Sequence, residues 1–244
     1  MSTTIALVTG ANKGVGLATA RQLAERGLTV YLGSRDRERG AQAAAGLAEA
    51  GVEVRPLEID ITDDASVGKA VDFLTAEHGR LDVLVNNAGI LHRKPALEVT
   101  AEDLAPEFET NVYGLVRVIH AVLPLLRRSA APRVVNVSST SAVFALAADP
   151  ETMFARSHDS FAYAATKAAV NMLTVKYANA FRADPGLAHV KINAITPGYV
   201  ATDMNDFHGT RTTEEGARAS VKLALLGPDG PSGGFFDEDG PMPW

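Results

Sequence analysis

The chain has 244 residues, of which 46% are hydrophobic and 21% charged, and its formal net charge is −6. This length fits one large α/β domain or two small ones, and the composition is that of a globular protein with a sizeable core. A negative balance without a dense basic run argues against non-specific nucleic-acid binding. The chain has no cysteine, which excludes disulfides and thiolate chemistry.

The N-terminal sequence has no signal-peptide pattern, and no run reaches the ~20 apolar residues of a membrane span. We therefore expect a cytoplasmic protein that does not enter a membrane. The six histidines show no H-x-x-x-H pair, so no metal site is expected.

Short apolar runs rich in β-branched residues alternate with segments of helical periodicity. Strands are predicted at 4–9, 28–34, 52–60, 81–87, 132–139 and 189–198, and helices at 14–26, 37–51, 63–79, about 101–128, 161–181 and 212–226. Such alternation indicates a parallel sheet covered on both faces. We predict a single α/β domain over residues 1–244, a Rossmann-type doubly wound parallel sheet with helices on both faces.

A glycine-rich turn joins the first predicted strand to the first helix. Gly10, Gly14 and Gly16 are spaced G-x-x-x-G-x-G, which differs from the usual G-x-G-x-x-G dinucleotide pattern. A helix N-terminus offers free N–H groups and partial positive charge to a phosphate, and glycines let the backbone approach it. The alternative is a turn with a structural role only, and four further motifs decide between the two.

These motifs are NNAG at 86–89, NVSS at 136–139, YAATK at 163–167 and PGYVATDM at 197–204. Together with TGANKGVG at 9–16, and in this order, they resemble the short-chain dehydrogenase/reductase family over nearly the whole chain. TGANKGVG, SRDRERG at 34–40, the segment 212–226 and the closing Trp244 are most similar to the monomeric NADPH-dependent carbonyl reductases. The resemblance implies reduction of a ketone, aldehyde or quinone to an alcohol.

The tyrosine and lysine of YAATK could form an acid–base pair. Tyr163 and Lys167 are four residues apart and share one helix face. A nearby ammonium favours phenolate and should lower the tyrosine pKa from about 10, so Tyr163 is predicted as the general acid. By the resemblance, Lys167 also bonds the nicotinamide ribose.

Ser139 is the predicted partner of the substrate oxygen. It ends a strand, where ligands bind in open α/β sheets, and its hydroxyl could steady developing charge. Strand alternation aims Ser138 to the opposite side, and the resemblance also selects Ser139. Asn111 matches the family's active-site asparagine, whose implied task is to hold a water that passes protons to Lys167. Local backbone bonding is the alternative role for Asn111.

Cofactor choice is predicted just after the second strand, where an acid would bond the 2′-OH of NAD and a base would accommodate the 2′-phosphate of NADP. Ser34 takes the acidic position, Arg35 follows, and Lys13 adds a second cation, which together favour NADPH. The alternative is that both cations are solvated surface charges, and Asp36 lies nearby. The resemblance implies further cofactor contacts at Gly10, Asn12, Gly14, Val15, Gly16, Asp60, Ile61, Asn87, Ala88, Gly89, Tyr163, Lys167, Pro197, Gly198, Val200 and Thr202.

Two other functions remain open. The same site could oxidise a secondary alcohol or reduce a 3-oxoacyl thioester, although acyl-carrier substrates favour basic lid residues and only Arg211 is there. The chain could instead be a non-catalytic NADP-binding interaction protein, against which the presence of Tyr163 and Lys167 argues. The partner expected from the resemblance is a small-molecule carbonyl compound.

Ser139 and Tyr163 are 24 positions apart, which indicates an insertion within residues 146–160. Its mixture of apolar and charged residues could cover an apolar stripe on the helices expected at 111–128 and 160–182. The resembled carbonyl reductases carry a longer insertion at this place and are monomers. We therefore predict a monomer.

Overall fold

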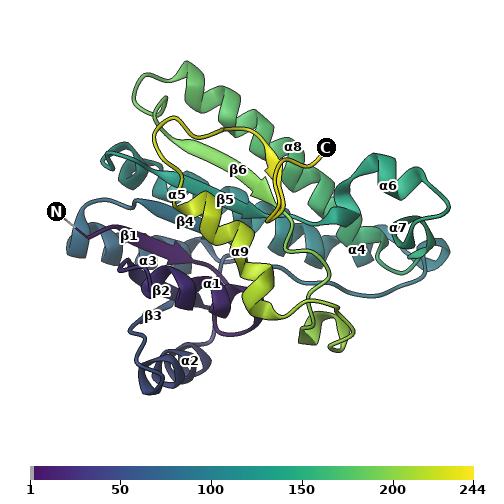
Figure 1. The fold of residues 1–244 in the computed structure, drawn as a ribbon, viewed down its shortest axis with the longest axis horizontal. Helices are drawn as coiled ribbons and strands as arrows, with labels where there is room; N and C mark the ends of the chain where they lie inside the picture. The colour runs from purple at the N-terminus through teal and green to yellow at the C-terminus, as the bar shows by residue number, and fades with distance from the viewer. Residues whose placement is uncertain (1–2) are drawn as a thin grey trace.

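The fold is built on a parallel sheet, described by a computed structural model for residues 3–244. Within these residues the sheet has seven strands, in the order β3-β2-β1-β4-β5-β6-β7. The strands are β1 (Ile5–Val8), β2 (Thr29–Ser34), β3 (Arg55–Glu58), β4 (Val83–Asn86), β5 (Arg133–Val137), β6 (Lys191–Ile195) and β7 (Phe235–Phe236). The predicted doubly wound parallel sheet is confirmed (Figure 1).

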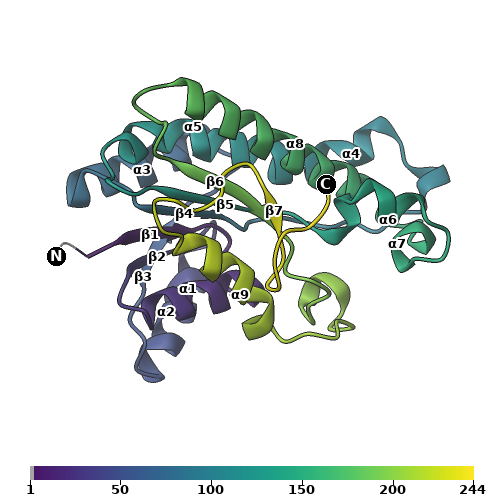
Figure 2. The same cartoon turned by 45° about the horizontal axis from the view of Figure 1, so that its top comes forward.

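Helices cover both faces of the sheet, with α3, α5 and α8 on one side and α1, α2 and α9 on the other (Figure 2). The helices are α1 (Gly14–Ala24), α2 (Arg37–Glu49), α3 (Asp64–His78), α4 (Ala101–Phe108), α5 (Gly114–Arg127), α6 (Phe144–Ala148), α7 (Met153–Arg156), α8 (Phe161–Ala183) and α9 (Thr213–Ala224). Short helical turns follow at η1 (Ala96–Glu98), η2 (Glu109–Tyr113), η3 (Thr140–Ala142) and η4 (Asp203–Asn205). None of the helices in the described part of the chain is long and apolar enough to cross a membrane.

Two apolar layers hold the helices to the sheet. On the α3–α5–α8 side, Leu74, Ile119 and Val170 pack against Leu7 and Leu84 of the strands. The opposite layer unites α1 and α9 with the other sheet face. Its members include Leu23, Val8, Val85, Val135 and Leu223. Because parallel strands are buried on both faces, all four residues of β1 and all four of β4 are buried, as their apolar runs predict.

The strand order reverses between β1 and β4, and their carboxyl ends meet at one edge of the sheet. This reversal is where open α/β sheets bind ligands. A buried polar chain ties the neighbouring strands together just behind that edge: Asn86 Nδ2 donates to Asn136 Oδ1 at 2.9 Å, and Asn136 Nδ2 donates to Thr174 Oγ1 of α8 at 2.9 Å. These two hydrogen bonds fix β4, β5 and α8 relative to one another beneath the candidate site.

The long helix predicted at about 101–128 is divided. Its first part is α4, its second is α5, and between them η2 widens into one π-helical turn. Pro106 and Pro124 lie inside the two helices. The apolar periodicity continues across this turn, because a single π-helical turn shifts the pattern by only one residue. The sequence pattern alone therefore predicts one continuous helix. The insertion, for which the sequence predicts no helix or strand, forms α6 and α7.

Candidate active site

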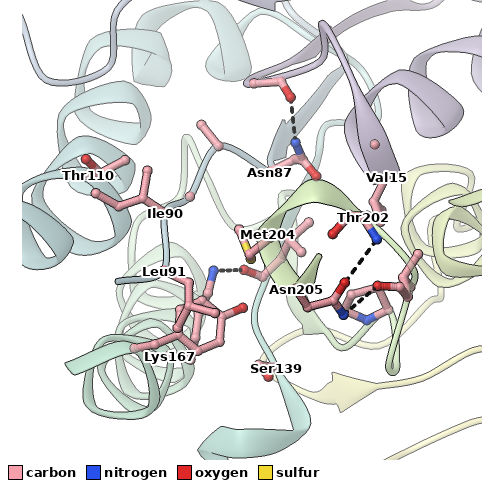
Figure 3. Close-up of a pocket in the computed structure, with 18 of the residues that line it drawn as sticks. Val15, Asn87, Ile90, Leu91, Thr110, Ser139, Lys167, Thr202, Met204 and Asn205 are labelled. Atoms are coloured by element: carbon pink, nitrogen blue, oxygen red, sulfur yellow. Dashed lines mark hydrogen bonds between the residues drawn. The ribbon is translucent and has the colours of Figure 1, made fainter. Parts of the chain in front are cut away.

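A cleft of about 910 Å³ opens at the carboxyl ends of the central strands. Of the predicted site residues, it is lined by Gly10, Asn12, Lys13, Gly14, Val15, Gly16, Arg35, Asp60, Ile61, Asn87, Ala88, Gly89, Ser139, Tyr163, Lys167, Pro197, Gly198, Val200 and Thr202. Ser34 and Asn111 are the two predicted residues that lie behind this lining. In the view of Figure 3, Val15 and Asn87 lie in the upper half of the picture, and Lys167 and Ser139 lie in the lower half.

Close backbone packing explains the glycines of the first turn. A Cβ on Gly16 would lie 2.4 Å from Asn87 Nδ2, and one on Gly10 would lie 2.7 Å from Ala88 Cα. Gly10 also has φ of +61°, a left-handed conformation that favours glycine. Asn87 holds the turn in place, because its Nδ2 donates to the carbonyl of Gly10 at 3.0 Å. The turn is therefore locked to the end of β4.

Helix α1 begins directly at the cleft with its N-terminal end open. Among the described residues, no side chain caps this end and no acidic residue occupies its first turn. The free N–H groups of the first turn and the positive end of the helix dipole thus face the cleft.

Lys13 bridges the two sides of the cleft mouth. Its ammonium forms an ion pair with Asp203 in η4, and both side chains are about half exposed. A pair this exposed contributes at most about 1 kcal/mol, so a stronger anion can displace the carboxylate. Arg35 also lines the cleft. Ser34 is turned away, because its hydroxyl donates to the carbonyl of Asp36 at 2.7 Å.

Ser139 lies two residues beyond the end of β5, at the start of η3, and lines the cleft. Its Oγ accepts from Ser141 Oγ at 2.9 Å and from the Ser141 N–H at 3.2 Å. A serine hydroxyl has two acceptor positions and one donor, so its own hydrogen remains to be donated. Ser138 also contributes to the cleft lining, but its hydroxyl is buried and its Oγ donates to the Lys167 carbonyl at 3.2 Å.

Tyr163 and Lys167 extend from one face of α8. Lys167 Nζ lies 5.5 Å from the centre of the Tyr163 ring and donates to the Val137 carbonyl at 2.7 Å. Figure 3 draws this bond from Lys167 as a dashed line. Desolvation lowers the pKa of Lys167 to about 8, although the charge of Glu107 opposes the shift.

The predicted lowering of the Tyr163 pKa is wrong for the free protein. Burial of the phenol raises its pKa to about 12, the charge of Glu107 adds to the rise, and a hydrogen bond with Ser139 acts against it. Desolvation penalises phenolate more than the hydrogen bond stabilises it. The phenol is therefore fully protonated at neutral pH, which is the state that a general acid needs.

Asn111 lies in the π-helical turn, behind the cleft wall. Its Oδ1 accepts from the Ile90 N–H at 2.8 Å, and its Nδ2 donates to the Ile90 carbonyl at 2.9 Å and to Thr166 Oγ1 at 3.0 Å. The side chain thus holds the segment after β4 against α8, which is the backbone-bonding role considered from sequence. Its implied water-holding role stays a prediction.

The insertion forms part of one wall of the cleft. Met153 and Phe154 of α7 line it, together with Phe161, Tyr199 and Met204 from neighbouring segments. Figure 1 shows α6 and α7 beyond the N-terminal end of α8. The expectation that the insertion covers the faces of the long helices is therefore wrong in its placement, because the segment is anchored elsewhere.

That anchor is a short parallel pairing with the segment that follows β4. The Lys94 N–H donates to the Asp159 carbonyl at 2.9 Å, and the Ala96 N–H donates to the His158 carbonyl at 2.8 Å. Arg93 adds an ion pair with Asp159 at 2.9 Å. The pairing carries the insertion over the substrate end of the cleft.

Sequence reasoning missed several supporting residues. Thr9 Oγ1 accepts the N–H groups of Asn87 and Ala88, at 3.1 and 3.2 Å. Ser141 orients Ser139, and Glu107 acts electrostatically on both Tyr163 and Lys167. The TG of the first motif could have indicated Thr9, whereas nothing in the sequence pattern indicates a buried Glu107. Residues 3–244 contain no cluster of three or more His, Asp or Glu side chains suited to a metal ion.

Comparison with known proteins agrees with this architecture. Residues 4–212 match the family model described as short chain dehydrogenase. The chain is 35% identical to short-chain dehydrogenase/reductase 1 of Saponaria officinalis, over 98% of this chain and 95% of that protein. It is 34% identical to carbonyl reductase [NADPH] 1 of Rattus norvegicus, over 98% of both.

Solved structures agree as well. The NADPH-bound carbonyl reductase from chicken fatty liver superposes with a TM-score of 0.85 at 26% identity, covering 100% of both chains. Salutaridine reductase from Papaver somniferum superposes with a TM-score of 0.81 at 28% identity, covering 96% of this chain and 99% of that one. The chain belongs to the short-chain dehydrogenase/reductase family, a family of oxidoreductases.

Proposed function

We propose that the protein reduces a ketone, aldehyde or quinone to an alcohol with NADPH as the hydride donor. The observation behind this proposal is the gathering of Ser139, Tyr163 and Lys167 in the cleft that also contains the glycine turn, Lys13 and Arg35. Similarity to reductases named for carbonyl substrates and NADPH supports it.

The first turn fits a dinucleotide diphosphate. The locked glycines and the uncapped start of α1 offer backbone N–H groups and dipole charge to phosphate oxygens. Lys13 and Arg35 could bind a 2′-phosphate through charge-assisted hydrogen bonds, with Lys13 exchanging Asp203 for it. Gly89, Pro197 and Thr202 would line the path toward Lys167.

The chemistry of the cofactor, when it is bound, is the delivery of hydride to the carbonyl carbon. Tyr163 donates its phenolic proton to the carbonyl oxygen as negative charge develops there. The Ser139 hydroxyl donates a hydrogen bond to the same oxygen. The Lys167 ammonium then stabilises the phenolate left on Tyr163, because opposite charges at this distance attract strongly in a desolvated site.

The substrate end of the cleft favours an apolar carbonyl compound. Met153, Phe154, Phe161 and Met204 provide aromatic and thioether surface there. Arg211, the basic lid residue considered for acyl-carrier substrates, is neutralised by Glu238 at 2.6 Å. These contacts favour a small apolar substrate over an acidic carrier.

A panel assay tests the proposed function. NADPH oxidation is followed by the absorbance of the reduced nicotinamide, with apolar ketones, aldehydes and quinones and, as a competing substrate, a 3-oxoacyl thioester. The other competing reaction, oxidation of secondary alcohols by NADP⁺, is followed as formation of NADPH. We expect turnover with apolar carbonyls. Absence of turnover with every compound, despite tight NADPH binding, would support the non-catalytic alternative instead.

NADPH should be strongly preferred over NADH, and the double change Lys13→Ala with Arg35→Ala should remove most of this preference. Charge-assisted bonds contribute about 1.5–3 kcal/mol each, so we expect the KM for NADPH to rise about 100-fold or more. The kcat should change little, because these contacts are remote from the reacting carbon. Steady-state kinetics with both cofactors measure the effect.

NADH is the internal control, since it has no 2′-phosphate to lose contact with. Lys69→Ala on α3 removes a charge outside the cleft and should leave both KM values unchanged. Equal kcat/KM for NADPH and NADH in the unmodified protein would contradict the assignment of Lys13 and Arg35.

We further infer that the chain acts as one domain. The monomer stays a prediction that rests on the resemblance to the carbonyl reductases, because the insertion lines the cleft and does not cover the long helices. Residues 3–244 share one sheet, and residues 1 and 2 lie outside the described part. Light scattering at micromolar concentration should give a mass close to the 25.7 kDa of the chain. A mass about four times larger would show a tetramer and contradict the prediction of a monomer, and because the insertion lines the cleft, deleting residues 147–158 should impair substrate binding.

A further inference from the structure

Glu107 is a carboxyl group buried directly behind the active site. It lies near the end of α4 with 0% of its surface exposed. Its Oε1 accepts a hydrogen bond from the His92 N–H at 2.7 Å. Its Oε2 is also buried and has no hydrogen-bond partner within residues 3–244.

The surroundings of Glu107 are rich in groups that titrate. Tyr163 and Lys167 face it from α8, His92 faces it from the segment after β4, and all three interact with its charge. On its own helix, Asp103 is already paired with Lys94 at 2.5 Å. The charge of Glu107 therefore acts on His92 and on the acid–base pair.

Lys167 is a buried cation whose charge interacts with that of Glu107. An ammonium has three donors, and the described contacts of Lys167 use one, to the Val137 carbonyl. The segment from Gly89 to His92 contacts both groups, because Glu107 accepts the His92 N–H and Gly89 packs against Lys167. A Cβ on Gly89 would lie 3.5 Å from Lys167 Nζ and 3.2 Å from Asn111 Oδ1, so the packing there is tight.

A purely structural role would not require an acid at this position. The His92 N–H needs only an acceptor, which a glutamine oxygen would also supply, and burying a carboxylate is far less favourable than burying an amide. Burial raises the pKa of Glu107, whereas the hydrogen bond from the His92 N–H and then the charges of His92 and Lys167 act in the opposite direction. The Lys167 ammonium is therefore one of the groups that stabilise the charged form of Glu107.

We propose that Glu107 is a positioning residue: it serves as a buried counter-charge that keeps Lys167 in its ammonium form, and its Oε1 holds the Gly89–His92 segment beside the reacting groups. This role rests on the proposed function, since Lys167 must be charged to stabilise the Tyr163 phenolate. Glu107 acts through Lys167 and does not touch the substrate.

The test is the protonation midpoint of Lys167, measured by NMR on the cofactor-free protein carrying [13C]lysine. The Lys167 signal is assigned with Lys167→Arg. The pKa of Lys167 is lowered to about 8, and Glu107 opposes that lowering. Glu107→Gln keeps the acceptor for His92 but removes the charge, so the midpoint should fall by about half a unit or more.

Glu102→Gln is the matched control, because it makes the same change at an exposed position of the same helix. It should leave the midpoint unchanged. An identical midpoint in Glu107→Gln and Glu102→Gln would overturn the proposal. If Glu107→Gln does not fold, [13C]glutamate labelling of the unmodified protein decides: the Glu107 carboxyl signal must shift at the pH where Lys167 loses its proton, and a signal without this step overturns the proposal.

Activity provides the second readout. The kcat/KM for NADPH reports groups of the free enzyme, and it should decline as Lys167 loses its proton above about pH 8. In Glu107→Gln this decline should begin at lower pH, whereas a purely structural defect would lower the rate equally at all pH values and overturn the proposal. Because the NMR midpoint needs no turnover, failure of the proposed function and failure of this inference are distinguishable.

Discussion

Replacement of Tyr163 by phenylalanine should lower kcat by about 10³- to 10⁴-fold, while NADPH binding stays close to that of the unmodified protein. A positioned general acid contributes about 10²–10⁴ in rate, and here the phenol is the group whose raised pKa keeps it protonated at neutral pH. The ring remains in Tyr163→Phe, so the packing of α8 and the cofactor end of the cleft are preserved. Stopped-flow turnover and fluorescence titration with NADPH separate the two effects.

Tyr177→Phe is the matched control, because it removes the same hydroxyl from the same helix, where the ring packs against Phe181. Its kcat should equal that of the unmodified protein. A Tyr163→Phe variant that retains a tenth of the activity would show that another group donates the proton.

Ser139→Ala should lower kcat by about 10²–10³, the usual cost of losing one donor to a developing oxyanion. The two acceptor positions of Ser139 are used by Ser141, so its hydrogen is directed to Tyr163 or to a substrate oxygen. Loss of this donor should also raise the free energy of the transition state more than that of the bound ground state. Comparison of kcat and KM for one good carbonyl substrate measures that difference.

Ser138→Ala is the neighbouring comparison. This hydroxyl is buried and donates to the Lys167 carbonyl, so its removal should lower the free energy of unfolding by about 1 kcal/mol. A rate loss in Ser138→Ala as large as in Ser139→Ala would contradict the assignment of roles to the two serines.

The fold could be predicted from sequence because its elements are long and periodic. The apolar runs at β1 and β4 and the glycines after β1 indicate a parallel sheet with a nucleotide-binding turn, and both the sheet and the locked turn are found. The two-residue strand β7 was not predicted, since Phe235 and Phe236 alone show no alternation. Helices α6 and α7 are likewise too short for a periodic signal.

The residues of the candidate site could be predicted from sequence, but the directions of their pKa shifts could not. Motif spacing indicates Ser139, Tyr163 and Lys167, whereas the direction of the Tyr163 pKa depends on how deeply the phenol is buried, which only packing determines. Glu107 escaped notice because a glutamate on a helix is usually exposed. The π-helical turn at Asn111 was missed for a related reason: its sequence has ordinary helical spacing.

The pairing of Lys94 and Ala96 with Asp159 and His158 has a consequence for how the protein can diversify. Backbone hydrogen bonds attach the insertion, and such bonds do not depend on which side chains the insertion carries. We therefore expect that substitutions in α6 and α7 change the lining of this end of the cleft, where Met153 and Phe154 lie, without breaking the attachment. Exchange of this segment between relatives should accordingly alter the range of carbonyl compounds that the proposed reductase accepts.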